Sequence, residues 1–290
     1  MEKIRIFEKP TLKAPVLVLG FGGWANGGEV STGIVAYLIK QLGAKKFAEI
    51  DPEPFYVFTI SRPETQIEEG MVLEHEMPTN EFFYWQNKKS AHDLLLFLGT
   101  EPNLRWQEFM NMFLDLAQEF KVVRSYNIGG FYNAIPHTSM PRVAVAYSDS
   151  RLKGELEKYD LQLTDYQGPT SIHTSFLTAF KERNIEAISL WSGTPHYIQV
   201  ANHKAWYSIL SKLTQMLDLE LDLDDIKSRG EELDQQLDRA LSQDPRLREY
   251  VRELEEHQEE AELREPLKTD EIIKSLEEFL KRRREGQKEE

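Results

Sequence analysis

Nearly continuous apolar runs that end in small-residue turns and lead into helix-like segments recur along this chain of 290 residues. Residues 14–21 form the first run, and such a run is typical of a strand buried on both faces of a parallel sheet. The glycine-rich turn 22–28 follows, and apolar residues at every fourth position then predict a helix over 29–42. The repeated order of strand, turn and helix predicts an α/β fold, a three-layer sandwich with right-handed crossovers.

The same patterns predict the remaining elements of the sandwich. The other expected strands are 47–50, 56–60, 82–86, 93–98, 122–128, 142–147 and 185–191, and the other expected helices are 104–120, 172–183 and 200–217. Thr170 or Ser171 is the natural N-cap of the helix that begins at Ile172.

The composition changes at Asp222, where glycine, proline and aromatic residues become rare. We therefore expect two domains, an α/β core over 1–221 and an acidic helical C-terminal extension over 222–290. Apolar residues at helical spacing predict three amphipathic helices in the extension, with Pro245 and Pro266 where helices begin or break. Their narrow apolar seams must pack on the core, on each other or on a neighbouring subunit.

Charge and composition exclude several classes of function. The net charge is −14, which repels phosphate backbones and argues against nucleic-acid binding. The absence of cysteine excludes disulfides, thiolate zinc sites and cysteine nucleophiles. Apolar stretches are too short for a membrane span or signal segment, so a cytoplasmic protein without membrane partners is expected.

Two Pro-His loops follow predicted strands, Ile135-Pro136-His137-Thr138 and Thr194-Pro195-His196-Tyr197. Because the carboxyl ends of parallel strands meet at one edge of a sheet, these loops mark a functional edge where ligands or partners bind. The alternative is that each loop is a rigid turn whose imidazole bonds nearby backbone.

The turn after the first strand matches the dinucleotide fingerprint only formally, as Gly20-x-Gly22-x-x-Ala25. The bulky indole of Trp24 and the extra turn residues occupy the place where a pyrophosphate would meet the helix. A tight turn that needs glycine is the favoured interpretation, and a nest of backbone N–H groups for an anion is the alternative. We expect no cofactor.

Polar and aromatic side chains after several strands are candidates for ligand or partner loops. They are Trp24, Asn26, Arg62, Glu101, Asn127, His137, Thr138 and His196. Together they could form a pocket for a small polar ligand, or they could satisfy loop backbones and interfaces. No histidine pair has the spacing of a zinc site and no serine lies in a Gly-x-Ser-x-Gly elbow, so we predict neither a metal nor a catalytic residue.

Several ordered segments resemble the proteasome assembly chaperone 2 family in its bacterial form. They are GFGGWANGGEVS, SRPE, GTEPNLRW, IGGFYNAIPHTSMPR, YQGPTSIHTSF and EAISLWSGTPHYIQVANHKAW. The resemblance implies an α/β fold similar to that of purine nucleoside phosphorylases, and membership of a family that tends to form oligomers.

Two functions from different classes remain open. The first is a non-enzymatic assembly or scaffold factor, a homo-oligomer of three or more copies, with proteasome or other protease-complex subunits as partners. The second is a small-ligand-binding protein or a phosphorylase-like or ligase-like enzyme that uses the strand-end loops. In that case Asn26, Asn127 and the two loop histidines would line the site, with Arg62 holding an anion and a histidine moving a proton.

Overall fold

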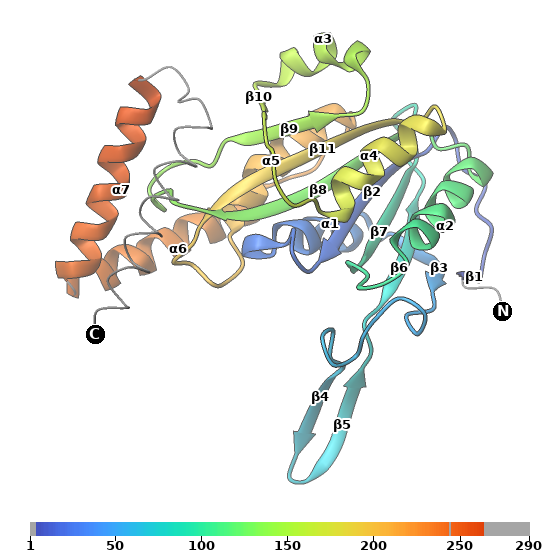
Figure 1. Cartoon of the computed structure of the whole chain (residues 1–290), viewed down its shortest axis with the longest axis horizontal. Helices are drawn as coiled ribbons and strands as arrows, with labels where there is room; N and C mark the ends of the chain where they lie inside the picture. The colour runs from blue at the N-terminus through green and yellow to red at the C-terminus, as the bar shows by residue number, and fades with distance from the viewer. Residues whose placement is uncertain (1–3, 244, 264–290) are drawn as a thin grey trace, which may run out of the picture. The chain divides into compact units, whose positions relative to one another are not determined.

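The computed structural model describes residues 4–243 and 245–263, and Figure 1 shows how their elements are arranged. Within these residues, nine strands form one mixed sheet, and helices cover both of its faces. In spatial order the strands are β1 (Ile4–Ile6), β3 (Lys45–Ile50), β6 (Asn80–Trp85), β7 (Leu94–Thr100), β2 (Val16–Gly22), β8 (Arg124–Asn133), β11 (Glu186–Pro195), β9 (Val143–Tyr147) and β10 (Gln162–Leu163).

The helices of the described chain follow the strands along the sequence. They are α1 (Val30–Leu42), α2 (Trp106–Glu119), α3 (Lys153–Leu156), α4 (Ile172–Glu182), α5 (His203–Met216), α6 (Asp224–Gln243) and α7 (Pro245–Leu263), with a 3₁₀ turn η1 (Gly27–Glu29) before α1. Pro245 begins α7, where the sequence predicts a helix start.

The central strand β2 is buried on both faces, as its continuous apolar run predicts. Leu17, Leu19 and Phe21 pack in the cluster that includes α2 and α4, whereas Val16 and Val18 pack in the cluster that includes α1 and α5. This alternation places one helix layer on each side of the sheet. The predicted three-layer α/β fold is therefore confirmed, while the likeness to phosphorylases stays a prediction.

β2, β7, β8 and β11 run parallel, so their carboxyl ends lie along one edge. The pairing of β2 with β8 stops at Gly20 and Ile128, although β2 stays paired with β7 as far as Gly22. The Ser31 hydroxyl of α1 bridges the place where the two strands part, because it accepts a hydrogen bond from the Phe21 N–H at 2.8 Å and donates to the Ile128 carbonyl.

The strand predicted over 56–60 is wrong, because this segment forms turns beneath the sheet. The Tyr56 hydroxyl bonds the Thr100 carbonyl at 2.6 Å, and the Val57 N–H donates to the Asn103 side chain at 2.9 Å. The second of these bonds uses a backbone N–H that a strand would give to its neighbour. A short apolar run alone does not distinguish the two conformations.

The chain also contains a two-stranded hairpin that the sequence patterns do not predict. It consists of β4 (Glu64–Glu68) and β5 (Met71–Glu76). Its turn residues Glu69 and Gly70 both have positive φ, 50° and 84°, which is the backbone of a two-residue hairpin turn. Figure 1 shows the hairpin extending away from the main sheet.

The described chain forms two compact units, residues 1–236 and the residues from 237 onward. The division predicted at 221/222 stays a prediction, and the third predicted helix and Pro266 lie outside the described residues. None of the described helices combines the length and the apolar character that crossing a bilayer requires.

Candidate functional site

The two Pro-His loops leave the sheet side by side. β8 and β11 stay in register to their ends, where Asn133 lies opposite Pro195. The Asn133 carbonyl accepts a hydrogen bond from the His196 backbone N–H at 3.1 Å, and the His196 Nδ1 lies 3.1 Å from the same oxygen. The Tyr197 hydroxyl accepts from the His137 backbone N–H at 2.7 Å and lies 2.8 Å from His137 Nδ1. These bonds fasten each loop to the other.

A cation ties the first Pro-His loop to the helices beneath it. The Lys204 ammonium at the start of α5 donates to the His137 carbonyl and pairs with Asp234 of α6. His137 is buried, and Thr138 beside it is exposed. The loop is thus a fixed platform that offers a few side chains to solvent.

Asn26 lies in the glycine-rich turn after β2, and its side chain organises the start of α1. Its Oδ1 accepts from the Thr32 N–H at 3.0 Å, and its Nδ2 donates to the Thr32 hydroxyl at 2.9 Å. A Cβ on Gly27 would lie 3.0 Å from the Phe131 backbone, and one on Gly28 would lie 2.6 Å from the Thr194 side chain. The turn is therefore pressed against the ends of β8 and β11, and a side chain at either glycine would collide with them.

Glu101 follows β7 and joins two neighbouring elements. Its Oε1 accepts a hydrogen bond from the backbone N–H of Ile172, at the start of α4, at 2.8 Å, and its carboxylate also bonds the backbone N–H of Trp24. Burial raises the pKa of Glu101, and these two backbone bonds oppose the rise. Trp24 and Glu101 are thus brought together at the strand-end edge.

Asn127 and Arg62 lie apart from the loop histidines. Asn127 is completely buried within β8, where its Nδ2 donates to the His173 carbonyl at 3.0 Å and its Oδ1 accepts from the Ser125 hydroxyl at 2.8 Å. Arg62 is exposed at the base of the hairpin, and no hydrogen bond within the described residues joins it to the Pro-His loops. The part these candidates play in function stays a prediction.

His173 of α4 was not among the candidates, although its surroundings are unusual. It is completely buried, its Nε2 lies 3.5 Å from the Ser31 hydroxyl, and the rings of Phe21 and Trp191 meet it edge-on at centroid distances of 5.3 and 5.4 Å. Burial lowers the pKa of His173 to about 3, so the imidazole is neutral at physiological pH. A serine and histidine sealed in the core hold elements together and reach no substrate.

Aromatic side chains gather in solvent at the strand ends. Trp24 is 60% exposed, and Phe131 and Tyr132, which end β8, are 40% and 45% exposed. Asn26 in the turn that holds Trp24 forms a bridge with Gly130, one residue before Phe131. Phe131 and Tyr132 are not among the predicted residues, because the apolar run that predicts this strand ends at residue 128. The segment Gly129-Gly130-Phe131-Tyr132 was the signal that could have extended it.

The described residues hold no group of three or more histidine, aspartate or glutamate side chains placed to bind a metal ion. The side chains of the polar candidates Asn26, Asn127 and His196 are hydrogen-bonded to neighbouring groups of the protein, Asn26 to α1, Asn127 to α4 and β8, and His196 to the end of β8. The strand-end edge therefore exposes aromatic surface on backbone that hydrogen bonds hold in place.

Comparison with known proteins agrees with this fold. The PAC2 family model matches residues 20–241. A PAC2 family protein from Streptomyces avermitilis is 30% identical, with a TM-score of 0.70 over 78% of this chain and 95% of that chain. A proteasome-assembly chaperone homologue from Mycobacterium tuberculosis is 29% identical, with a TM-score of 0.73 over 81% and 99% of the two chains.

An archaeal proteasome activator from Pyrococcus furiosus is 26% identical, with a TM-score of 0.66 over 82% of this chain and 97% of that chain. None of the curated proteins matches the chain. The family model spans most of the sequence, and the Streptomyces protein is matched over nearly its whole length. The chain belongs to the PAC2 family.

Proposed function

We propose that this protein is a non-enzymatic assembly factor, which forms a homo-oligomer and binds proteasome subunits or subunits of another protease complex. Two similar structures support the choice of partner, because one is described as a proteasome-assembly chaperone homologue and the other as an archaeal proteasome activator. The observation that carries the proposal is the exposed hairpin of β4 and β5.

Every residue of the two hairpin strands is exposed to solvent. Ile67, Met71 and Val72 near the tip are 59%, 64% and 59% exposed. An isolated two-stranded hairpin is at best marginally stable in water, and apolar side chains gathered on a projection are typical of an interaction surface. The occupant we assign to this hairpin is a second copy of the chain.

The charges on the hairpin favour a particular kind of self-association. Glu64 lies opposite Glu76, and Gln66 lies opposite Glu74. Two hairpins paired edge to edge would bring these carboxylates together, which is unfavourable. The hairpin is therefore expected to pack on a different surface of the next copy. Head-to-tail contacts form a ring when the rotation between copies closes, and we expect such a ring of three or more subunits.

The exposed aromatic side chains at the strand ends are the surface that we assign to the partner. Tryptophan and tyrosine are enriched among residues that dominate binding energy, and Trp24 and Tyr132 stand on backbone that hydrogen bonds hold in place. Because these two side chains stand on fixed backbone, this protein would lose little conformational freedom when a partner binds them.

Light scattering after size exclusion tests the homo-oligomer. The wild-type protein is expected to elute as a multiple of 33.8 kDa, and the double variant Ile67→Ser, Val72→Ser as a monomer with unchanged circular dichroism. Val123→Ser is the matched control, because Val123 is also exposed but precedes β8 at the opposite edge of the sheet. A wild-type monomer, or an oligomer that keeps its mass in the double variant, would contradict the assignment.

Affinity purification from the native host under mild crosslinking tests the partner. Wild-type protein is expected to recover proteasome or other protease-complex subunits, and the variant Trp24→Ser, Tyr132→Ser is expected to lose them while it keeps its oligomeric mass. Leu163→Ser on the exposed edge strand β10 serves as control. Recovery of the homo-oligomer alone by the wild type, or equal recovery of these subunits by the double variant, would contradict the proposed partner surface.

A further inference from the structure

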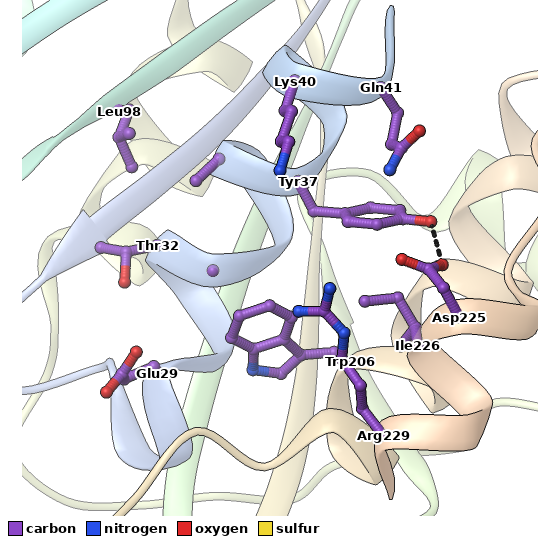
Figure 2. Close-up of a pocket in the computed structure, with 12 residues that line it drawn as sticks. Glu29, Thr32, Tyr37, Lys40, Gln41, Leu98, Trp206, Asp225, Ile226 and Arg229 are labelled. Atoms are coloured by element: carbon purple, nitrogen blue, oxygen red, sulfur yellow. Dashed lines mark hydrogen bonds between the residues drawn. The ribbon is translucent and has the colours of Figure 1, made fainter.

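A cavity of about 350 Å³ lies beside α1, where the first turns of α6 and the start of α5 meet it. All of its lining residues belong to the first compact unit. Figure 2 shows the cavity with the Trp206 indole and the Tyr37 ring at its sides. This volume falls in the range of small-molecule sites.

The apolar walls of the cavity are held in place. A Cβ on Gly33 would lie 1.9 Å from the Trp206 ring, so α1 and the indole are in direct contact, and the Trp206 Nε1–H donates to the Gly28 carbonyl at 3.0 Å. The Tyr37 hydroxyl is bonded to Asp225 Oδ1 at 2.7 Å. The site is therefore formed before any ligand arrives, which lowers the entropic cost of binding.

Two cationic side chains from different helices line the cavity. Figure 2 shows Lys40 of α1 and Arg229 of α6 extending toward the middle of the cavity from opposite sides. Their backbones take part in helix hydrogen bonds, but within the described chain neither side chain forms a hydrogen bond or an ion pair. Two carboxylates also line the cavity, Glu29 and Asp225 of α6, and the second accepts a hydrogen bond from the Tyr37 hydroxyl. The lining therefore holds two cations and two carboxylates, a balanced set of charges in a protein whose net charge is −14.

We propose that this cavity binds a small organic anion, a phosphate or carboxylate group that carries an apolar body. Lys40 and Arg229 hold the anionic group by charge-assisted hydrogen bonds, and Trp206 with Ile226 packs against the body. The site is separate from the strand-end edge, and the inference does not depend on the assembly function.

The positions of the two cations on different helices predict that the ligand also stabilises the packing of α6. Lys40 belongs to α1 and Arg229 to α6, so an anion that bonds to both ties the first half of α6 to the core. The ligand stabilises the conformation that binds it, and the amides of residues 224–236 are expected to exchange more slowly when it is present.

The test uses phenyl phosphate as the probe, with the full chain titrated by calorimetry or by the NMR signal of the Trp206 indole N–H. Phenyl phosphate is expected to bind more tightly than inorganic phosphate, and benzyl alcohol is expected not to bind. Arg229→Gln and Lys40→Gln are each expected to weaken phenyl phosphate binding about tenfold, the loss of about 1.4 kcal/mol. Lys227→Gln is the matched control, because this exposed lysine on α6 does not line the cavity.

Hydrogen exchange of residues 224–236 with and without phenyl phosphate supplies the second readout. Slower exchange in the wild type and in Lys227→Gln, but not in Arg229→Gln, supports the site. The proposal is overturned if phenyl phosphate does not bind, if Lys227→Gln weakens binding as much as Arg229→Gln, or if benzyl alcohol binds as well as phenyl phosphate. Each result can be read whether or not the protein forms an oligomer.

Discussion

The Glu101 carboxylate accepts a hydrogen bond from the backbone N–H of Ile172 at 2.8 Å, and so joins the end of β7 to the start of α4. The bond satisfies one of the N–H groups that a helix leaves unpaired at its N-terminus, and it places a negative charge where the helix dipole favours one. We expect Glu101→Ala to lower the free energy of unfolding by about 1–3 kcal/mol, the range for an unsatisfied buried group. Chemical denaturation measures this loss, and Glu182→Ala, which removes an exposed carboxylate at the end of α4, is a control that should change little.

The raised pKa of Glu101 also predicts a pH dependence. Because burial disfavours the charged carboxylate in the folded state, its contribution is most favourable below pH 4.5, the ordinary value, and declines as the pH rises through the raised pKa. Glu101→Gln removes this titration. The stability of the wild type relative to Glu101→Gln should therefore fall as the pH rises above 4.5, and a constant difference across that range would contradict the prediction.

The buried His173 gives the free energy of unfolding the opposite dependence on pH. Its pKa falls from 6.5 to about 3 on folding, so the unfolded chain takes up a proton that the folded chain refuses. Stability should decline as the pH drops from 6.5 toward 3, by at most about 1.4 kcal/mol per pH unit from this residue. His173→Leu should give a shallower slope in denaturation curves. Thr174→Ala on the exposed side of α4 is the control, because it changes no titratable group, and its slope should match that of the wild type.

Gly33 and Gly154 form a matched pair for testing how tightly α1 packs. A Cβ at position 33 would lie 1.9 Å from the Trp206 ring, whereas one at position 154 meets nothing within 4 Å. Gly33→Ala should lower the free energy of unfolding by about 1–3 kcal/mol through overpacking. Gly154→Ala should leave it unchanged or raise it by about 0.5–1 kcal/mol, as expected for alanine in a helix. Thermal unfolding of the two variants checks the contrast, and equal effects would contradict it.

The pair Lys204–Asp234 predicts coupling between α5 and α6. Both side chains are largely buried, and Lys204 also donates to the His137 carbonyl. A double-mutant cycle with Lys204→Met and Asp234→Asn should give a coupling energy of about 1 kcal/mol. The exposed pair Lys89–Glu220 offers a comparison, since solvent-exposed ion pairs contribute little. A coupling no larger than that of the exposed pair would show that α6 is not held at this point.

The sequence was most informative where burial sets the pattern. The run from Val16 to Phe21 must be apolar on both faces because helices cover both, and that requirement predicted the layers and the edge where the Pro-His loops meet. Short or exposed elements carry no such constraint. Tyr56 is as apolar as a strand residue but hydrogen-bonds from a turn, and the hairpin from Glu64 to Glu76 has no buried face to impose alternation.

The candidate residues show the same limit. His137 and His196 were placed correctly at the strand ends because they follow strands that could be recognised. Asn127 was expected there as well, but β8 continues to Asn133, so its amide is enclosed in the sheet. Lys40 and Arg229 are 189 positions apart in sequence, and a pattern within either helix does not reveal that they serve one cavity.

The Ser31 hydroxyl, which bridges Phe21 and Ile128, gives α1 an unusual place in this protein. A helix that only rests on a sheet can slide by a fraction of a turn while its apolar contacts adjust. Here such a slide would break the two hydrogen bonds by which the Ser31 hydroxyl bridges β2 and β8 where they part. The position of α1 along the sheet is therefore fixed by hydrogen bonds as well as by apolar packing. A shift of α1 along the sheet would therefore be felt first at the ends of β2 and β8.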